Sequence, residues 1–233
     1  MKIEVWSDFS CPFCYLGKTR LEKAVSHLGL QDEVELEFRS FLLNPFAPKT
    51  TELRGAAAFA KQKDVSKAEA EGMFTQVSTL FQQEGLDANM DNLVMTSTLD
   101  AHRLAKYARS QHKENVLSNR LLQAYFRDGL NLADHEVLLD IAEQSGLNRE
   151  EAKAVLASEA YLDTVNAEIA QARSFGVSGV PFFVLEDKYS ISGAQPQEYF
   201  NQAIEQVWKE SHPLTPLGST PDGVCSDGSC SLN

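Results

Sequence analysis

The feature that most constrains this chain is a Cys-x-x-Cys segment, placed where a predicted strand passes into a predicted helix. Residues 2 to 7 are rich in strand-forming side chains, and Cys11 and Cys14 follow, with Pro-Phe between them. Proline suits the first helical position, and apolar residues at helical spacing continue to Gly29. Val34 to Phe38 then alternates apolar and acidic residues, as a half-buried strand does. The first forty residues therefore predict strand, Cys-x-x-Cys, helix and strand.

This placement indicates redox chemistry at the cysteine pair. The free N–H groups and the dipole of a helix N-terminus stabilise an anion, which favours the thiolate of the first cysteine. Thiolate is the attacking species in disulfide exchange. We therefore expect Cys11 to be an exposed nucleophile and Cys14 a more buried resolving thiol. Pro12 and Phe13 bring no charge, so the sequence predicts no pKa and no potential.

Helical periodicity dominates the middle of the chain. It extends from about residue 66 to about residue 175, with glycines that punctuate it. Strand character returns at Val180–Leu185, where Pro181 stands near the start. A turn at Glu186-Asp187 predicts a hairpin, and Pro196 precedes a last amphipathic helix. The order predicts an α/β fold with an all-helical insertion.

The predicted organisation has four parts. Residues 1–45 and 176–210 form the two halves of one α/β unit, and residues 46–175 form the helical insertion. Residues 211–233 are rich in Pro, Gly and Ser, which predicts a flexible tail.

Charge and composition narrow the classes of partner. The 233 residues carry 21 Lys and Arg against 33 Asp and Glu, a net charge of −12. Phosphate backbones and anionic lipid surfaces repel such a chain, so we expect neither nucleic-acid nor membrane binding. No apolar run approaches the length of a membrane helix. The first residues do not resemble a signal peptide, and we expect a cytoplasmic protein, whose thiols are mostly reduced.

A second cysteine pair, Cys225 and Cys230, lies in the predicted tail. One interpretation is two exposed thiols without a role. The other is a second redox pair, since a four-residue gap can close into a disulfide ring. A flexible segment of about fifteen residues spans about 20 Å, enough to visit the first pair. We favour the second redox pair.

Several segments together resemble the DsbA-like thioredoxin-fold oxidoreductases, in the cytosolic FrnE-type branch related to 2-hydroxychromene-2-carboxylate isomerases. The resemblance extends from about residue 2 to about residue 210. The pairing of the Cys-x-x-Cys segment with the later Gly-Val-Pro-Phe element is its most specific part. The matching segments are residues 5–14, 41–45, 101–104, 176–183 and 192–195.

The resemblance implies a thioredoxin fold whose helical insertion covers the active-site groove. It implies that Pro181 is a cis-proline beside the cysteines, and that the backbone of Val180 meets an incoming disulfide or peptide. With Pro12 and Phe13, these residues form the expected substrate-binding site. The redox-active disulfide replaces any tightly bound cofactor. The partners are protein or small-molecule disulfides and thiols, glutathione is a candidate substrate, and the chain is a monomer or homodimer.

Two other functions remain open. Glutathione-dependent isomerases and kappa-type transferases look like this chain, but typically carry serine where Cys11 stands, which argues against that function. Asn44 matches a glutathione-contacting asparagine of the isomerases, although Asn-Pro is equally typical of a turn. The third candidate function is a protein that binds zinc through its four cysteines, whereas the strand–helix placement favours redox chemistry over a metal site.

The remaining titratable side chains have simpler interpretations. We expect His102 to be partly buried and Arg103 to form a surface ion pair, although the resemblance places one of them near the groove. The other four histidines have no partners at metal-ligand spacing, so we expect them on the surface: His27, His112, His135 and His212.

Overall fold

The computed structural model describes residues 1–213. Its strands are β1 (Lys2–Ser7), β2 (Glu35–Ser40), β3 (Phe182–Leu185) and β4 (Tyr189–Ser192). The helices are α1 (Pro12–His27), α2 (Gly55–Lys63), α3 (Lys67–Glu84), α4 (Leu99–Ser110), α5 (Glu114–Phe126), α6 (His135–Gln144), α7 (Arg149–Leu156), α8 (Leu162–Ser174) and α9 (Gln197–Ser211), with a short 3-10 turn at Met90–Asn92. None of these helices is long and apolar enough to cross a membrane.

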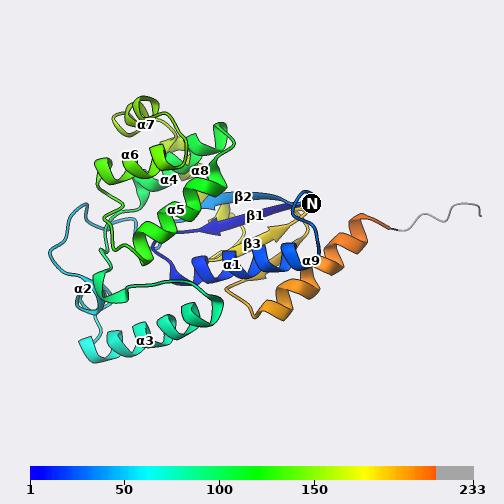
Figure 1. The fold of residues 1–233 in the computed structure, drawn as a ribbon, viewed down its shortest axis with the longest axis horizontal. Helices are drawn as coiled ribbons and strands as arrows, with labels where there is room; N and C mark the ends of the chain where they lie inside the picture. The colour runs from blue at the N-terminus through cyan, green and yellow to red at the C-terminus, as the bar shows by residue number, and fades with distance from the viewer. Residues whose placement is uncertain (214–233) are drawn as a thin grey trace, which may run out of the picture.

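The four strands form one mixed sheet in the order β2-β1-β3-β4. β2 runs parallel to β1, while β3 is antiparallel to both β1 and β4. The two ends of the chain thus meet in the middle of the sheet, where Val5 pairs with Phe38 on one side and Phe183 on the other. Figure 1 shows this sheet with α1 and α9 alongside it. The α/β thioredoxin fold with its helical content is confirmed.

Apolar side chains cover both faces of the sheet. On one face, α1 and α9 pack Leu21 and Phe200 against strand residues such as Ile3 and Phe183. On the other, Trp6 contacts α8, where its indole N–H donates to the carbonyl of Glu168 at 3.0 Å. The sheet is therefore the central layer between two sets of helices. This packing fixes the C-terminal end of β1, after which the Cys-x-x-Cys segment begins.

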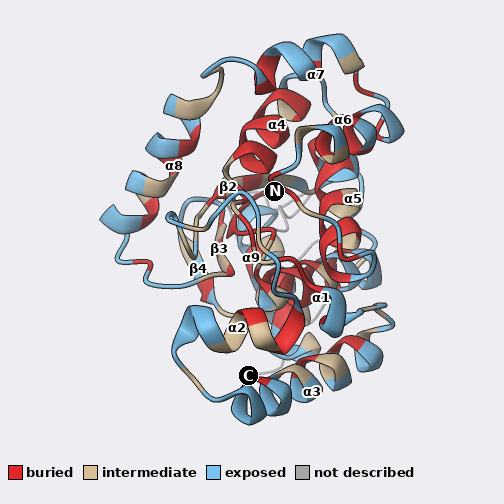
Figure 2. Ribbon diagram, turned by 90° about the vertical axis from the view of Figure 1, so that its left-hand side faces the viewer, coloured by how far each residue is buried: buried red, intermediate tan, exposed pale blue. Residues whose placement is uncertain are grey.

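A separate hydrophobic cluster lies among the helices between β2 and β3 in the chain. Its fully buried members include Phe81, Leu104 and Phe126, and Tyr15 and Leu16 of α1 join it. Figure 2 shows α4 buried along most of its length, in accord with the nine consecutive buried residues Asp100–Ala108. α1 thus contributes to both hydrophobic clusters and connects the sheet with the helices.

The helical segment begins earlier than the sequence pattern predicts. It starts at Gly55, in α2, and not near residue 66. Prolines just upstream and a polar last turn conceal this short helix, which ends at Asp64 in the left-handed conformation. β2 is likewise shifted to Glu35–Ser40. The division into units at residues 45 and 175 stays a prediction.

The outer edge of β2 is closed by charged side chains. The Ser40 N–H donates to Glu168 Oε2 at 2.7 Å, and the Phe38 carbonyl accepts from Lys106 Nζ at 2.6 Å. Lys106 and Glu168 pair at 2.8 Å with both side chains at most 4% exposed. An edge strand normally presents unpaired backbone groups. Here buried ions from α4 and α8 satisfy them.

The Glu168 carboxylate should make folding stability depend on pH. Burial raises its pKa, but Lys106, the Ser40 N–H and Arg109 outweigh burial and lower it to about 2. A carboxyl group with a depressed pKa in the folded state stabilises above its unfolded pKa, and that stability is lost as the pH falls toward the folded value. The window therefore lies between the ordinary value of 4.5 and about 2.

We expect Glu168→Ala to lower the free energy of unfolding at neutral pH by about 3 kcal/mol, the energy of a shift of this size. Urea denaturation at neutral pH and at about pH 3 measures it, and the variant should lose less stability on acidification than the natural chain. Glu159→Ala, an exposed change just before α8, is the matched control. Equal pH slopes for Glu168→Ala and the natural chain would contradict this assignment.

Candidate active site

The Cys-x-x-Cys segment occupies the N-terminus of α1. β1 ends at Ser7, the Cys11 N–H donates to the Asp8 carbonyl at 3.0 Å, and Pro12 is the first helical residue. Cys11 is the N-cap residue, and no side chain caps this end. The first turn holds no acidic residue. The Cys11 sulfur therefore stands at a helix N-terminus whose first turn carries no acidic side chain.

Cys11 is more buried than the sequence interpretation suggests. It is 3% exposed and Cys14 is 1% exposed, so the expectation of an exposed nucleophile is wrong. The Cys11 Sγ donates to the Val180 carbonyl at 3.4 Å, which places the thiol between α1 and the loop before β3. Both cysteines are free thiols in the structure. Cys11 also lines an adjoining apolar cavity.

Cys14 lies deeper and is held as a neutral thiol. Burial raises its pKa well above the usual value, and the neighbouring Cys11 raises it further. The Ser7 hydroxyl and the Asp8 backbone oppose this shift without cancelling it. A Cys14 thiol in this state attacks only after losing a proton.

The Val180–Pro181 peptide bond is cis. Pro181 lies against α1 at Gly17, where an added Cβ would stand 3.0 Å from the Pro181 ring and 3.0 Å from Phe183. A side chain at this position would force the Pro181 or Phe183 ring to shift by a few tenths of an ångström, so glycine fits this close approach best. The loop brings the Val180 carbonyl to the Cys11 sulfur.

An apolar cavity of about 500 Å³ opens beside Cys11. Pro12, Phe13, Gly179 and Val180 line it on the side of the sheet. The opposite wall comes from helices α2, α3 and α5 and the segment between α3 and α4: Phe59, Met73, Phe74, Gln76, Val77, Leu80, Met90, Leu93, Met95, Tyr125 and Phe126. Of the predicted site residues in the described part, Cys11, Pro12, Phe13 and Val180 line this cavity, whereas Cys14 and Pro181 lie behind it.

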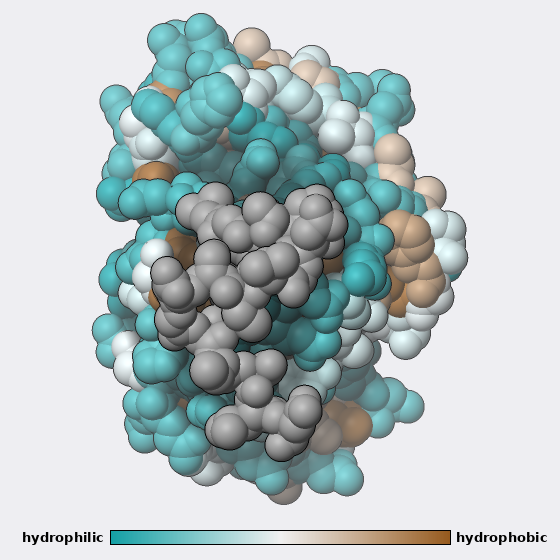
Figure 3. Space-filling view, turned by 90° about the vertical axis from the view of Figure 1, so that its right-hand side faces the viewer, coloured by the Kyte–Doolittle hydropathy of each residue, from teal (hydrophilic) through white to brown (hydrophobic). Residues whose placement is uncertain are grey.

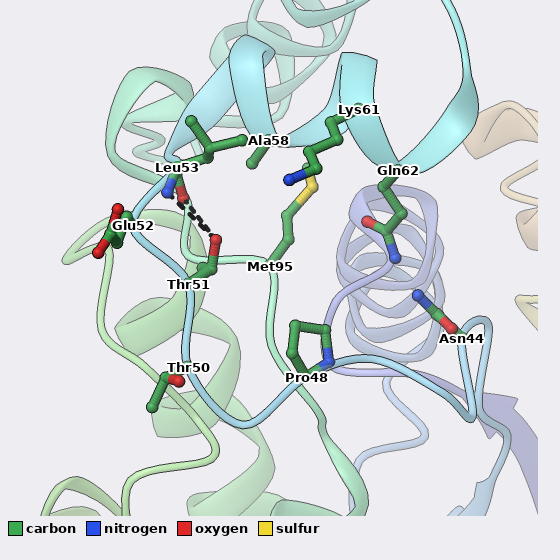
Figure 4. A pocket seen from close by; sticks show the side chains of 10 residues that line it. All are labelled: Asn44, Pro48, Thr50, Thr51, Glu52, Leu53, Ala58, Lys61, Gln62 and Met95. Carbon is green, nitrogen blue, oxygen red and sulfur yellow. Dashed lines mark hydrogen bonds between the residues drawn. The ribbon is translucent and has the colours of Figure 1, made fainter.

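Two further cavities continue from the first. A small one of about 120 Å³ shares Ser10, Pro12 and Tyr125 with it and reaches Asn44. A larger one of about 600 Å³ begins at Asn44, where the Asn44 and Gln62 side chains point toward each other (Figure 4). The Asn44 carbonyl oxygen Oδ1 accepts from the Phe46 N–H at 3.1 Å, so the side chain forms a turn. Asn44 therefore fits the turn interpretation, and it lines the small cavity together with Ser10 and Pro12.

Asp8 is a site residue that the sequence interpretation missed. It is 1% exposed, and its carboxylate accepts from the Ser10 N–H at 3.1 Å, the Thr98 hydroxyl at 2.8 Å and the Leu43 N–H at 2.7 Å. Burial raises its pKa, but His102 and these N–H groups outweigh burial and lower it. The only available signal was its position three residues before Cys11. Its partners lie up to 90 residues away in the chain.

His102 and Arg103 differ from expectation. His102 is 3% exposed, stacks on Phe9 at 4.7 Å, and lies 3.8 Å from the Asp8 carboxylate. Arg103 is buried, pairs with Asp100 at 2.7 Å and donates to backbone carbonyls before α8. The predicted surface ion pair is therefore wrong, because α7 and the loop after it cover this side of α4. His102, in contrast, lies beside Asp8, in the segment that leads from β1 to Cys11.

The described residues, 1–213, bear on the zinc-binding alternative. No group of three or more His, Cys, Asp or Glu side chains in this part could hold a metal ion. Cys225 and Cys230 lie outside the described residues. On the face shown in Figure 3, the apolar residues of the described part form small separate groups within a largely hydrophilic surface.

The sequence and fold match known proteins. A family model for the DSBA-like thioredoxin domain matches residues 2–205. A probable DsbA oxidoreductase from Streptomyces coelicolor is 36% identical, with 98% of this chain and 100% of that chain covered and a TM-score of 0.85. YwbO from Bacillus subtilis, an uncharacterised protein, is 26% identical over 89% of this chain and 98% of its own length.

A third protein shares the fold at low identity. The cytosolic disulfide reductase DsbM from Pseudomonas aeruginosa, solved with GSH, is 15% identical and has a TM-score of 0.59. The alignment covers 91% of this chain and 98% of that chain. Given a family model that matches nearly the whole described chain, this protein belongs to the DsbA-like thioredoxin domain family.

Proposed function

We propose that this protein is a thiol–disulfide oxidoreductase in which Cys11 attacks and Cys14 resolves. The observation that carries the proposal is the placement of the Cys11 sulfur. It stands at a helix N-terminus that no side chain caps, contacts the Val180 carbonyl beside a cis-proline, and borders an apolar cavity. A helix N-terminus favours the anionic form of a thiol, and an incoming disulfide has room to approach the sulfur.

The reaction follows from these positions. The Cys11 thiolate attacks one sulfur of a substrate disulfide, the substrate S–S bond breaks, and the leaving thiolate takes up a proton. Cys14 then loses its proton and attacks the Cys11 sulfur, which releases the second substrate thiol. The substrate gains two electrons and the protein keeps a Cys11–Cys14 disulfide. In reverse, the same steps oxidise a dithiol, and relative potentials set the direction.

We propose protein and small-molecule disulfides and thiols as partners, and a cytoplasmic location. No tightly bound cofactor enters the mechanism, because the cysteine pair carries the electrons. Glutathione stays a candidate substrate, supported by the GSH present with the similar disulfide reductase. The chain is proposed to act as a monomer or homodimer.

Cys225 and Cys230 are proposed as a second redox pair. Their support is the sequence alone: two cysteines separated by four residues near the chain end. Such a pair would exchange with the Cys11–Cys14 disulfide by the same chemistry, passing two electrons between the pairs and leaving one of them oxidised.

Reduction of insulin disulfides by dithiothreitol is the direct test. We expect the natural chain to accelerate the reaction and Cys11→Ser to abolish that acceleration. The reason is that Cys11 is the only described cysteine at the N-cap position of a helix. Cys14→Ser should retain the attack but accumulate a mixed disulfide, visible by mass spectrometry. A chain ending at Ser211 measures the contribution of the second cysteine pair.

Other results would overturn the proposal. An inactive natural chain that isomerises or conjugates glutathione adducts would indicate the isomerase or transferase function. Stoichiometric zinc in the purified protein, lost in both cysteine variants, would indicate the zinc-binding function.

We propose that Asp8 positions residues 8–11, the segment that leads from β1 into α1. Its three hydrogen bonds tie Ser10, Leu43 of the loop after β2 and Thr98 before α4 to one carboxylate. Asp8→Asn removes the charge and turns an N–H₂ group toward at least one donor. We expect a loss of about 2–3 kcal/mol in the free energy of unfolding, as for hydrogen bonds to a charged group.

Insulin reduction by Asp8→Asn should also slow more than stability explains, measured at a temperature where the variant is fully folded. Asp163→Asn, an exposed change in α8, is the matched control. Natural stability and natural activity in Asp8→Asn would show that the loop does not depend on this carboxylate.

A further inference from the structure

We propose that Met73 is an oxidation site, at which a hydroperoxide forms methionine sulfoxide, and that this modification slows disulfide exchange at Cys11. The effect on exchange rests on the proposed oxidoreductase function. The modification itself is a separate reaction, at a thioether that the exchange mechanism does not use.

The first observation is the position of the methionines. After Met1, the chain contains three, which are Met73, Met90 and Met95. All three line the cavity that Cys11 borders, although they come from α3, the 3-10 turn and the segment before α4. Every thioether after the first residue therefore belongs to a side chain that borders the space next to the Cys11 thiol.

The second observation is that the sulfur-containing residues of this cavity differ in exposure. Met73 is 45% exposed, Met95 is half-buried, and Met90 is 7% exposed. Cys11 is 3% exposed. Oxidation of sulfur side chains by peroxides depends on their accessibility. A peroxide that approaches the cavity from solvent therefore meets the Met73 thioether before the deeper sulfur atoms.

The third observation is the chemistry around Met73. Its neighbours in the cavity wall include Phe74 and Val77, and none of the lining residues is Asp, Glu, Lys or Arg. A thioether suits this wall, whereas a sulfoxide is polar and accepts hydrogen bonds. Gln76, three residues further along α3, brings the adjacent amide donor of the lining. A sulfoxide that accepts from Gln76 or from water replaces apolar surface beside Cys11 with a polar group.

The oxidation balances without the cysteines. The Met73 sulfur attacks one oxygen of the hydroperoxide, and the O–O bond breaks. The sulfur loses two electrons and becomes a sulfoxide, while the other oxygen takes the proton and leaves as water or an alcohol. Thiols reduce a Cys11–Cys14 disulfide, but a sulfoxide returns to the thioether through a methionine sulfoxide reductase. The modification therefore persists through a cycle of thiol reduction.

The experiment oxidises the full chain while its cysteines are protected. Methyl methanethiosulfonate converts the thiols to disulfides, hydrogen peroxide is added and then removed with catalase, and dithiothreitol regenerates the thiols. Peptide mass spectrometry follows the gain of one oxygen at each methionine. We expect Met73 to react at least about fivefold faster than Met90, because its sulfur is far more accessible.

Insulin reduction before and after the peroxide measures the effect on exchange. The treated natural chain should be at least about threefold slower, since a polar group replaces an apolar contact beside Cys11, and methionine sulfoxide reductases A and B should restore its rate. Met73→Leu keeps an apolar side chain and should retain its own untreated rate after the peroxide. Met95→Leu, the matched control, removes a less exposed thioether of the same cavity and should slow as the natural chain does.

The outcomes separate this inference from the proposed function. Three results would overturn the inference alone, provided that the untreated chain reduces insulin through Cys11. They are oxidation of Met73 no faster than of Met90, a Met73 sulfoxide with an unchanged insulin rate, and equal slowing of treated Met73→Leu and natural chain. An untreated chain without Cys11-dependent activity would overturn the proposed function and the effect on exchange, while the peptide masses would still decide whether Met73 is an oxidation site.

Discussion

The structure depends on how the edge strand β2 is closed. A free edge would expose backbone donors and acceptors next to the core, yet here Glu168 and Lys106 bind them directly. Because these side chains belong to α8 and α4, the same contacts dock the helices onto the sheet. Removing one partner would leave a buried charge and a buried backbone group unpaired together, a larger penalty than the net value of either hydrogen bond.

That docking carries through to the active site. α4 is fixed against β2 near its C-terminal end, and the residues at its other end, Thr98 and His102, stand at the Asp8 carboxylate. Asp8 in turn holds the loop that presents Cys11. A buried ionic network is a costly way to bind two layers, but its directional bonds set one register between them. The Cys11 sulfur is thus positioned by contacts that begin at the edge strand β2.

The sequence predicts the local parts of this arrangement and misses the long-range ones. Strand β1, helix α1 and the hairpin after Pro181 follow from periodicity and turn residues that are neighbours in the chain. The burial of Cys11 does not, since the group that covers its sulfur is Val180, 169 residues away. Asp8 was missed for the same reason, because an Asp after a strand looks ordinary until its distant neighbours are placed.

The cysteine pair and the cavity wall opposite it are built by different parts of the chain, so family membership does not identify a substrate. The sulfur chemistry needs only a helix N-terminus, two cysteines and the loop before β3, and these lie within the segments that carry the family resemblance. The cavity wall opposite Cys11 is built mostly by α2, α3 and α5. In this protein they present apolar and methionine side chains, so the wall that faces Cys11 differs in chemistry from the loop and helix N-terminus that hold the cysteine pair.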